Sequence, residues 1–478
     1  MRVQSVPWAG RTLWPPVAAF LLILAGGSLI ALLPIEAALA LVVGGIVFLA
    51  VLVRVELGLY LLTFVVPFSS LWEINLRDFD ITATDFLVPL IFVAWLTRLV
   101  RLRQARVTFT PLIPTLLFFL AVFLGSTLVA TSVAHSFKEI AKWLEMGAIF
   151  LVTVNTVRER HMPYIVGGLL GAGVVEALVG WYQVLTGTGP AGFQIAPGVL
   201  RAFGTFGQPN PFAGYLGTLL PLGYGLILGG VVVRGFRLKL LWLSLAILLV
   251  ALLMSFSRAG WLAVATALAI MTMVKVPRST IYLVLAALLG MLVALLGLFN
   301  LLPPQVASRL ASVAELVSIF DVRYVVLTPE NWAVVERMVN WQAAWDMFVA
   351  NPWLGVGVGN FSAVFESYAL PGWTNTTGHA HNYYLNLLAE TGVLGLLAYL
   401  LFLTTAFVYV GRRIALMAKK GWRTEAPWTA AATLGIMGVL VATSVHNLFD
   451  NVYVHSMAVQ VGLMLGLASV SLRQLARK

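Results

Sequence analysis

Two histidines, His379 and His381, stand where a long polar stretch meets an apolar run that begins at residue 383. Their i, i+2 spacing places both imidazoles on one side of an extended segment. A neutral imidazole near pH 7 is suited to take a proton from a hydroxyl group, so this pair predicts a general base. The alternative is a structural histidine bonded to a loop carbonyl.

A metal site is a second possible use of these imidazoles. We find no third ligand near them at a recognisable spacing, and His446 is the only other outer histidine of note. Asp78 and Asp80 form an Asp-x-Asp pair of the kind with which glycosyltransferases often hold a divalent cation, which prefers oxygen ligands. Two acids in a polar loop are usually only solvated. The sequence therefore predicts neither a metal nor a cofactor.

Three arginines, Arg201, Arg258 and Arg337, lie outside the segments that carry most of the basic residues. The planar guanidinium matches phosphate oxygens and keeps its charge, so a convergence of the three predicts a diphosphate site. For two of these arginines an explanation without a ligand is also available. Arg201 could snorkel to lipid headgroups, and Arg337 could pair with nearby Glu336.

The local patterns around these arginines differ. Arg201 opens a turn rich in glycine and proline, residues 201–212. Arg258 lies in a very short hairpin between apolar runs, where Ser255 and Ser257 can cap the following helix. A charge deep in a bilayer costs about 2.5–3.5 kcal/mol on insertion scales, and an anionic ligand would offset that cost.

Arg337 belongs to a predicted helix. Thr328, Pro329 and an acid give a helix-start signal, an apolar stripe follows, and Asn351-Pro352 ends the helix. The glycine-rich residues 355–359 then predict a flexible loop. This is no nucleotide loop, because it follows a helix and not a strand.

The elements that must position these residues are transmembrane helices. The chain has 478 residues, of which 60% are hydrophobic and only 10% charged, whereas a soluble chain carries about 25% charge. Continuous apolar runs of roughly 17–25 residues predict an all-α polytopic membrane protein with about 12–14 transmembrane helices, and exclude a barrel. The absence of cysteine excludes disulfides and thiolate sites.

Spans are predicted from one end of the chain to the other. We place them at residues 17–33, 36–53, 57–71, 84–100, 112–131, 138–156, 163–185, 210–232, 239–255, 259–274, 280–301, 383–410, 428–446 and 452–471. Three regions follow: transmembrane helices with short outer loops over 1–301, a long periplasmic loop containing helices over 302–382, and C-terminal transmembrane helices over 383–478.

The orientation follows from lysine and arginine. With a cytoplasmic N-terminus, most of the 30 basic residues fall in inner loops. The same bias explains the net charge of +11 without a nucleic-acid partner. We expect both termini in the cytoplasm, and residues 72–83, 186–209, 302–382 and 446–451 on the outer face.

Four stretches resemble a known family. They are Arg-Ala-Phe-Gly-Thr-Phe-Gly-Gln-Pro-Asn (201–210), Ser-Arg-Ala-Gly-Trp (257–261), Glu-Arg-x3-Trp (336–341) with Asn-Pro-Trp-Leu-Gly-Val-Gly (351–357), and His-Asn-Tyr-Tyr-Leu-Asn-Leu-Leu-Ala-Glu-Thr-Gly (381–392). Over about residues 200–450 the chain resembles the bacterial O-antigen ligase / O-unit polymerase superfamily, polytopic membrane glycosyltransferases of the GT-C class.

The resemblance implies a reaction at the periplasmic face of the bacterial inner membrane. Such enzymes take a glycan from undecaprenyl diphosphate and pass it to a hydroxyl acceptor, which is the lipid A core in ligases and a second lipid-linked glycan in polymerases. They are thought to be metal-independent and inverting. By motif, His381 matches the base, with His379 a looser match, and Arg201, Arg258 and Arg337 match the diphosphate-binding arginines.

Four further residues are expected to support this site: Asn210, Asn382, His446 and Asp450. His446 and Asp450 share another outer hairpin, from which they can support the site by hydrogen bonding.

The sequence favours a ligase slightly over a polymerase. The rival from another class is a transporter or flippase for a lipid-linked sugar, which predicts charges near the bilayer midplane. Glu176, within the span 163–185, is the one residue that fits it. The chemistry-bearing residues cluster instead at the outer face, which favours an enzyme in a lipid membrane.

Overall fold

The computed structural model describes most of the chain. The described residues are 33–71, 73–76, 79–103, 107–231, 235–276, 282, 320–328, 331–370, 372–373, 378–422 and 426–476. The predicted spans 17–33 and 280–301 lie outside them, apart from Leu33 and Tyr282.

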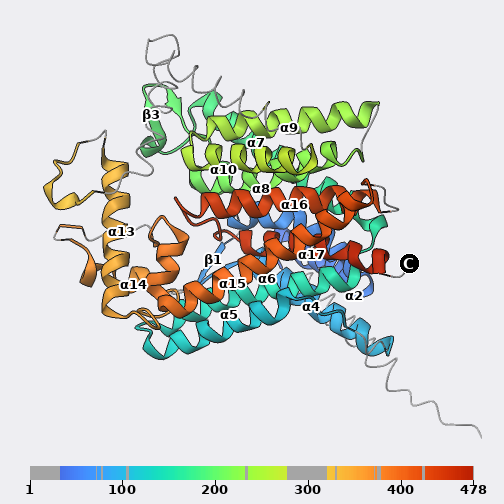
Figure 1. Ribbon diagram of the computed structural model, residues 1–478, viewed down its shortest axis with the longest axis horizontal. Helices are drawn as coiled ribbons and strands as arrows, with labels where there is room; N and C mark the ends of the chain where they lie inside the picture. The colour runs from blue at the N-terminus through green and yellow to red at the C-terminus, as the bar shows by residue number, and fades with distance from the viewer. Residues whose placement is uncertain are drawn as a thin grey trace, which may run out of the picture.

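Long apolar helices form the body of the protein and run roughly alongside one another (Figure 1). Within the described ranges, nine helices are long and apolar enough to cross a membrane, which confirms the predicted all-α polytopic fold. These nine and three further helices, α3, α6 and α17, make up the bundle: α2 (Ile35–Val53), α3 (Val55–Phe68), α4 (Ala83–Arg101), α5 (Leu112–Ser126), α6 (Val133–Thr156), α7 (Met162–Thr186), α8 (Pro209–Leu228), α9 (Phe236–Met254), α10 (Arg258–Lys275), α15 (Tyr383–Lys419), α16 (Pro427–His446) and α17 (Met457–Ala476).

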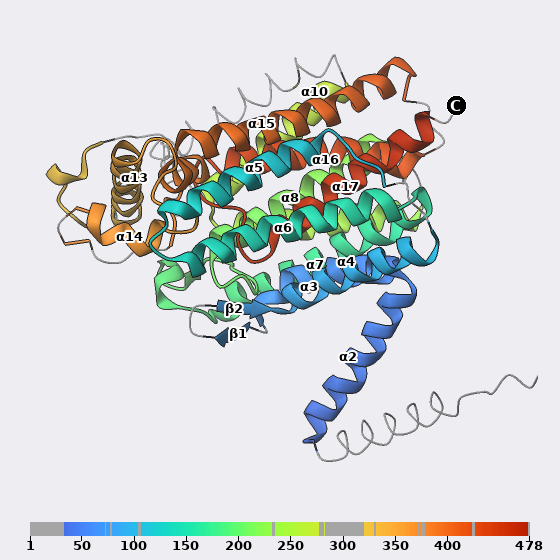
Figure 2. The ribbon, with the colours of Figure 1, turned by 90° about the horizontal axis from the view of Figure 1, so that it is seen from below.

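Most of these bounds agree with the predicted spans to within a few residues, because length and hydropathy together fix where a helix can cross a bilayer. The first described helix, α2, projects away from the other helices (Figure 2). Its apolar side chains are largely exposed, as expected of a surface in contact with lipid.

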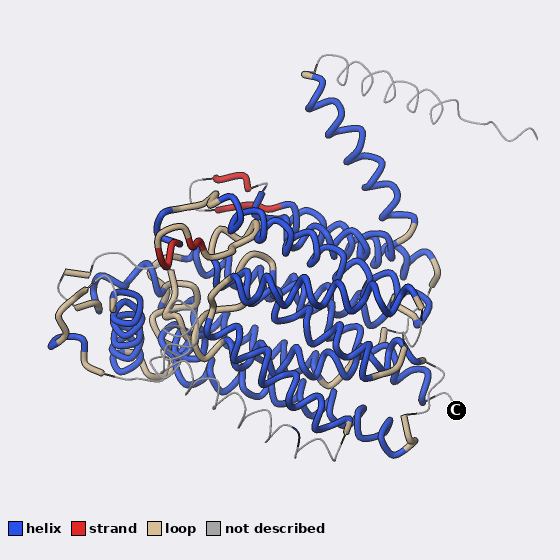
Figure 3. The backbone as a smooth tube through the Cα atoms, turned by 90° about the horizontal axis from the view of Figure 1, so that it is seen from above, coloured by secondary structure: helices blue, strands red, loops and turns tan. Residues whose placement is uncertain are grey.

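One end of the bundle carries the shorter elements. Helix α13 (Trp332–Ala350) lies across the ends of the long helices, with α14 (Phe361–Tyr368) beside it (Figures 1 and 2). Two antiparallel hairpins, β1–β2 (Glu73–Leu76 and Phe79–Thr82) and β3–β4 (Gln194–Ala196 and Val199–Leu200), lie at the same end (Figure 3). We call it the loop end.

The start of α13 differs from the prediction by one turn. Its N-cap is Asn331 and the helix begins at Trp332, whereas the predicted first residue, Pro329, lies outside the described residues. Thr328 and Asn331 bond each other reciprocally, since Oδ1 of Asn331 accepts from the Thr328 N–H and Oγ1 of Thr328 accepts from the Asn331 N–H. The predicted threonine is therefore not the N-cap itself, but it holds the N-cap residue Asn331 by these two hydrogen bonds. The predicted end at Asn351 is confirmed.

The last predicted spans need two corrections. The span placed at 383–410 is a helix of 37 residues with a break at Gly392, whose φ of 63° and ψ of −166° suit only glycine. The span placed at 452–471 begins at Met457, because residues 447–456 form an ordered loop. Hydropathy alone does not reveal either feature.

The glycine-rich loop after α13 is ordered and not flexible as predicted. The Val356 and Gly357 N–H groups donate to the carbonyls of Ala389 and Glu390 at 3.0 Å, just before the break in α15. A Cβ at Gly355 would lie only 2.3 Å from the Glu390 backbone. The glycines are required here because two backbones touch, at positive φ.

Pairs of small residues bring the central helices together. On α8, a Cβ at Gly225 would lie 2.5 Å from the backbone nitrogen of Gly435 on α16, and one at Gly229 would lie 2.5 Å from Cβ of Ala431. This small-xxx-small packing is typical of helix pairs in membranes, where close backbone approach replaces the hydrophobic driving force. It fixes α16, and hence the loop that follows it, against α8.

We predict that Gly225→Ala destabilises the protein by about 1–3 kcal/mol, because the added methyl overlaps the backbone of α16. The measurement is the midpoint of thermal unfolding in detergent. The control is Gly171→Ala on α7, where an added Cβ meets nothing within 4 Å. Equal midpoints for the two variants would contradict the packing role of Gly225.

Candidate active site

The two histidines lie in a short loop at the start of α15. Asn382 caps the helix, and its Oδ1 accepts from the N–H groups of Tyr384 and Leu385 at 3.0 and 3.1 Å. One turn on, Oδ1 of Asn386 accepts from the Ala380 N–H at 3.0 Å. His381 has a φ of 50°, a strained conformation for a residue with a side chain. The loop is therefore held in one shape by α15.

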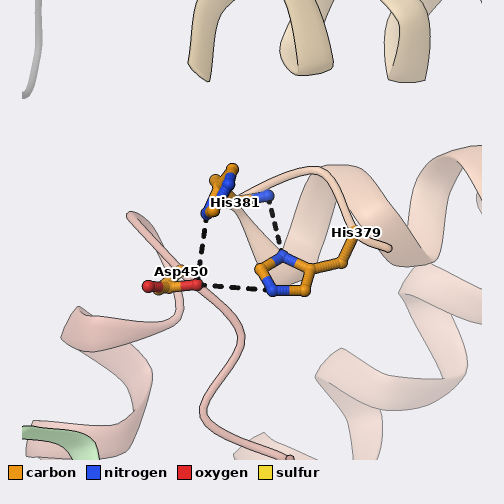
Figure 4. A group of neighbouring side chains, drawn as sticks. All are labelled: His379, His381 and Asp450. Carbon is orange, nitrogen blue, oxygen red and sulfur yellow. Dashed lines mark hydrogen bonds and ion pairs between the residues drawn. The ribbon is translucent and has the colours of Figure 1, made fainter. Parts of the chain in front are cut away.

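Asp450 joins both imidazoles (Figure 4). Its Oδ1 lies 3.4 Å from Nδ1 of His381 and 3.7 Å from Nε2 of His379. Nδ1 of His379 accepts from the backbone N–H of His381 at 3.1 Å. A neutral His379 must then carry its proton on Nε2, facing Asp450. In a neutral His381 whose Nδ1–H faces the carboxylate, Nε2 carries the lone pair that a base needs.

Asp450 reaches this position through the loop that follows α16. The Asp450 N–H donates to the carbonyl of His446 at 3.0 Å, and the Tyr383 N–H donates to the carbonyls of Asn447 and Asp450 at 2.8 and 3.2 Å. The carboxylate is buried. From sequence, Asp450 had only a supporting role. The structure places it at the centre of the cluster, which spacing along the chain did not indicate.

Burial and charge set the protonation of the cluster. Burial lowers the pKa of His379 to about 4, against the opposing attraction of Asp450, so His379 is neutral near pH 7. Burial acts most strongly on Asp450 and would raise its pKa. The hydrogen bond and charge of His381, with the charges of His379 and His446, outweigh burial and hold the pKa of Asp450 well below its usual range. Asp450 is therefore a fixed negative charge.

Arg201 is oriented by two acceptors. Its Nη2 donates to Oδ1 of Asn210, the second residue of α8, at 2.9 Å, and its Nε donates to the carbonyl of Ser255 at 2.9 Å. The next N–H, of Ala202, donates to the carbonyl of Met254. The segment that carries Arg201 is thus bonded to the end of α9, immediately before the segment that carries Arg258.

Polar residues of α7 hold the same turn. Oε1 and Oε2 of Glu176 accept from the hydroxyl and the N–H of Thr205 at 2.6 and 3.1 Å, and Oε1 of Gln183 accepts from the N–H groups of Phe203 and Gly204. From sequence, Glu176 fits only the transporter alternative. In the structure its carboxylate bonds Thr205 and so holds the turn that follows Arg201. Glu176 and Gln183, seven residues apart on one face of an apolar helix, were the available signal.

Arg258 is the first residue of α10 and is buried. The predicted cap is confirmed for Ser257, whose Oγ accepts from the Gly260 N–H at 3.4 Å. Ser255 does not cap α10, since it ends α9 and its Oγ accepts from the Ser257 N–H at 3.2 Å. Phe256 has a φ of 50°. The hairpin is therefore a strained, hydrogen-bonded turn that presents Arg258 at the loop end.

Arg337, on α13, completes the set. Its Nε and Nη1 are buried, and neither forms a hydrogen bond with Glu336 or with any other described residue. Burial is the main effect that lowers the pKa of Arg337, while the charge of Asp450 raises it and the charge of Arg258 lowers it. Arg337 therefore lies within electrostatic reach of both the histidine–aspartate cluster and Arg258.

The remaining predicted residues are placed as follows. His446 is the last residue of α16 and is buried. Its Nε2 has no hydrogen-bond partner among the described residues, and its charge acts on Asp450. Asn382 and Asn210 serve the backbone of α15 and the side chain of Arg201, respectively. All the predicted site residues therefore belong to the loop end or bond to residues that do.

The cluster has the composition of a metal site. One ligand atom each from His379, His381 and Asp450 lies within 4.8 Å of the others. Asp450 supplies the third ligand that the spacing of residues near the two histidines does not reveal. The other pair considered from sequence is different: in the described part of the chain, Asp80 is exposed and paired with Lys138 at 2.8 Å, and Asp78 lies outside the described residues.

Comparison with known proteins points to a family. No curated protein matches the chain. Residues 243–400 match a family model described as O-antigen ligase. The matched segment contains Arg258, Arg337, His379 and His381, whereas Arg201 and Asp450 lie outside it and join the site through the folded structure. Over residues 243–400 this multi-pass membrane protein is thus similar to the O-antigen ligase family, and its resemblance to the O-antigen ligase / O-unit polymerase superfamily is confirmed.

Proposed function

We propose that this protein is a glycosyltransferase that moves a glycan from undecaprenyl diphosphate to a hydroxyl acceptor, in the manner of an O-antigen ligase with the lipid A core as acceptor. The observation that carries the proposal is the contact of His381 with Asp450 at 3.4 Å, with Asp450 within electrostatic reach of Arg337 and Arg337 within reach of Arg258. A base and a phosphate-binding group are the two things that this reaction needs.

In the proposed step, His381 accepts the proton of the acceptor hydroxyl on Nε2. Asp450 faces Nδ1, and its negative charge stabilises the imidazolium that forms. The acceptor oxygen then bonds to the anomeric carbon as the bond from that carbon to the diphosphate oxygen breaks. A single displacement of this kind inverts the configuration at that carbon.

The departing diphosphate takes the electron pair of the broken bond. Nε and Nη1 of Arg337 are buried and have no hydrogen-bond partner in the described part of the chain, and Arg201 and Arg258 are presented by hydrogen-bonded turns. Fixed cations stabilise a charge that grows in the transition state more than they stabilise the ground state. The apolar surfaces of the long helices suit the polyprenyl tail.

The proposed setting is the bacterial inner membrane, with both termini in the cytoplasm and the loop end in the periplasm. The basic residues of the opposite loops support this orientation. A polymerase of the same superfamily, with a second lipid-linked glycan as acceptor, is the closest alternative. The transporter alternative is less favoured. Glu176, the one residue that fits it, accepts hydrogen bonds from Thr205 and holds the turn after Arg201.

The first prediction concerns the reaction itself. Purified protein given a lipid-linked oligosaccharide in EDTA should transfer the glycan to lipid A core, because neither the base nor the arginines require a metal. A ladder of products from donor alone indicates a polymerase. Loss of activity in EDTA that returns with a divalent cation would assign His379, His381 and Asp450 to a metal. No product in any lane, with or without metal, would favour the transporter.

The second prediction concerns the base. His381→Ala should slow transfer by about 10³-fold or more while binding of the donor survives, because only proton removal is lost. The control is His161→Ala, at the start of α7, which should retain the wild-type rate. Normal turnover by His381→Ala would remove the base assignment.

The third prediction concerns the diphosphate. Arg258→Ala should weaken binding of undecaprenyl diphosphate by about 10- to 100-fold, the effect of losing a charge-assisted hydrogen bond. The control is Lys138→Gln, which removes a cation that is already paired with Asp80 on the surface. Affinity can be measured by titration in detergent. Equal affinities of the two variants would leave Arg258 without a role in binding.

A further inference from the structure

A pocket of about 610 Å³ lies beside α13, outside the cluster of histidines and arginines. Trp341, Gln342, Trp345 and Asp346 line it from α13, and Leu385 lines it from the first turn of α15. This volume falls in the range of small-molecule sites, which combine apolar and aromatic walls with a few placed polar groups.

We propose that this pocket is a glycan subsite that holds sugar residues of the lipid-linked donor. The proposal rests on the proposed function and adds to it the residues that select the glycan. Two sets of observations support it: the aromatic surface of the pocket and its unsatisfied polar atoms.

The aromatic surface comes from Trp341 and Trp345, which are four residues apart and so lie on one face of α13. Trp345 is 52% exposed, and its ring contacts Phe348 with centroids 5.4 Å apart. A pyranose ring has an apolar face of C–H groups and a rim of hydroxyls. Flat indole surfaces suit the apolar face, and they order at low cost in conformational entropy.

The polar atoms match the hydroxyl rim. Nε1 of Trp341 and Oε1 of Gln342 are both buried, and neither has a hydrogen-bond partner among the described residues. One is a donor and the other an acceptor, and both residues line the pocket. A buried polar group without a partner carries a desolvation penalty, which a sugar hydroxyl can relieve in either direction. An acyl chain could satisfy neither atom.

The pocket and Arg337 of the proposed diphosphate site share α13. Arg337 lies one turn before Trp341 and two turns before Trp345, so the three follow one stripe about 12 Å long at 1.5 Å per residue. A diphosphate held at Arg337 would direct the attached sugars along this stripe. Leu385 closes the pocket from the helix that begins beside His381.

The acidic groups indicate a neutral ligand, not an anionic one. Asp346 lines the pocket, and so does Asp321, which is paired with Arg323 at 2.5 Å and accepts from Nε2 of Gln342 at 3.4 Å. Arg323 is therefore already matched by a carboxylate. A phosphate here would meet Asp346, whereas sugar hydroxyls can donate to it.

The test compares donors of two lengths with the full chain in detergent: undecaprenyl diphosphate bearing one sugar, and the same lipid bearing the full oligosaccharide. Trp345→Ala should raise KM for the long donor about tenfold and leave kcat within about twofold of the wild-type value. KM for the short donor should not change. Gln342→Leu should act in the same direction. The control is Trp353→Ala, which removes an exposed tryptophan just after α13 that does not line the pocket.

A binding measurement separates this proposal from the proposed function. The free oligosaccharide, released from its lipid, should bind the wild type by saturation-transfer NMR and lose most of its signal with Trp345→Ala, whether or not the protein transfers sugar. A raised KM for the acceptor, with an unchanged KM for the long donor, would overturn the assignment of the pocket to the donor. Unchanged KM values with unchanged free-glycan binding would overturn the proposal and leave the indoles as membrane-interface anchors.

Discussion

The need to satisfy every backbone N–H and C=O away from water is the constraint on which this structure depends. In the long spans, helices meet it internally. Where the chain leaves the helices at the loop end, side chains supply the hydrogen-bond partners that the backbone needs. Glu176 and Gln183 bond the turn after Arg201, Asn386 bonds the histidine loop, and Glu390 accepts from the Phe361 N–H at the start of α14. These hydrogen bonds fix the conformation of the irregular segments at the end of the helix bundle.

The site is assembled from segments that are far apart in the sequence. Arg201 and Arg258 are coupled through the carbonyl of Ser255, and Asp450 is coupled to the histidine loop through the Tyr383 N–H. The close contact of α8 with α16 sets the distance between these two halves. A change in the bundle can therefore act on the chemistry without touching a functional side chain.

The sequence predicted much of this arrangement, for physical reasons. Hydropathy and length located the long helices, and arginines in apolar surroundings such as Arg258 indicated an anion site because a charge there is costly without one. The role of Asp450 was not predictable, since it depends on a loop that brings residue 450 beside residue 381. The break at Gly392 was missed because residues 383–410 are apolar enough on average to read as one span, although Glu390 and Thr391 directly precede the glycine. The structure of residues 355–359 was misjudged because glycine marks both flexible loops and tight backbone contacts.

The helix starts at the loop end have a common electrostatic consequence. Arg258 is the first residue of α10, Asn210 the second of α8, and Asn382 the cap of α15. Each of these helices directs the positive end of its macrodipole, about half an elementary charge, toward the region of the arginines and His381. This field comes from peptide groups that cannot titrate or change rotamer. An anion held there would thus feel a positive potential that persists even when an arginine is replaced, and single arginine variants should leave part of the attraction in place.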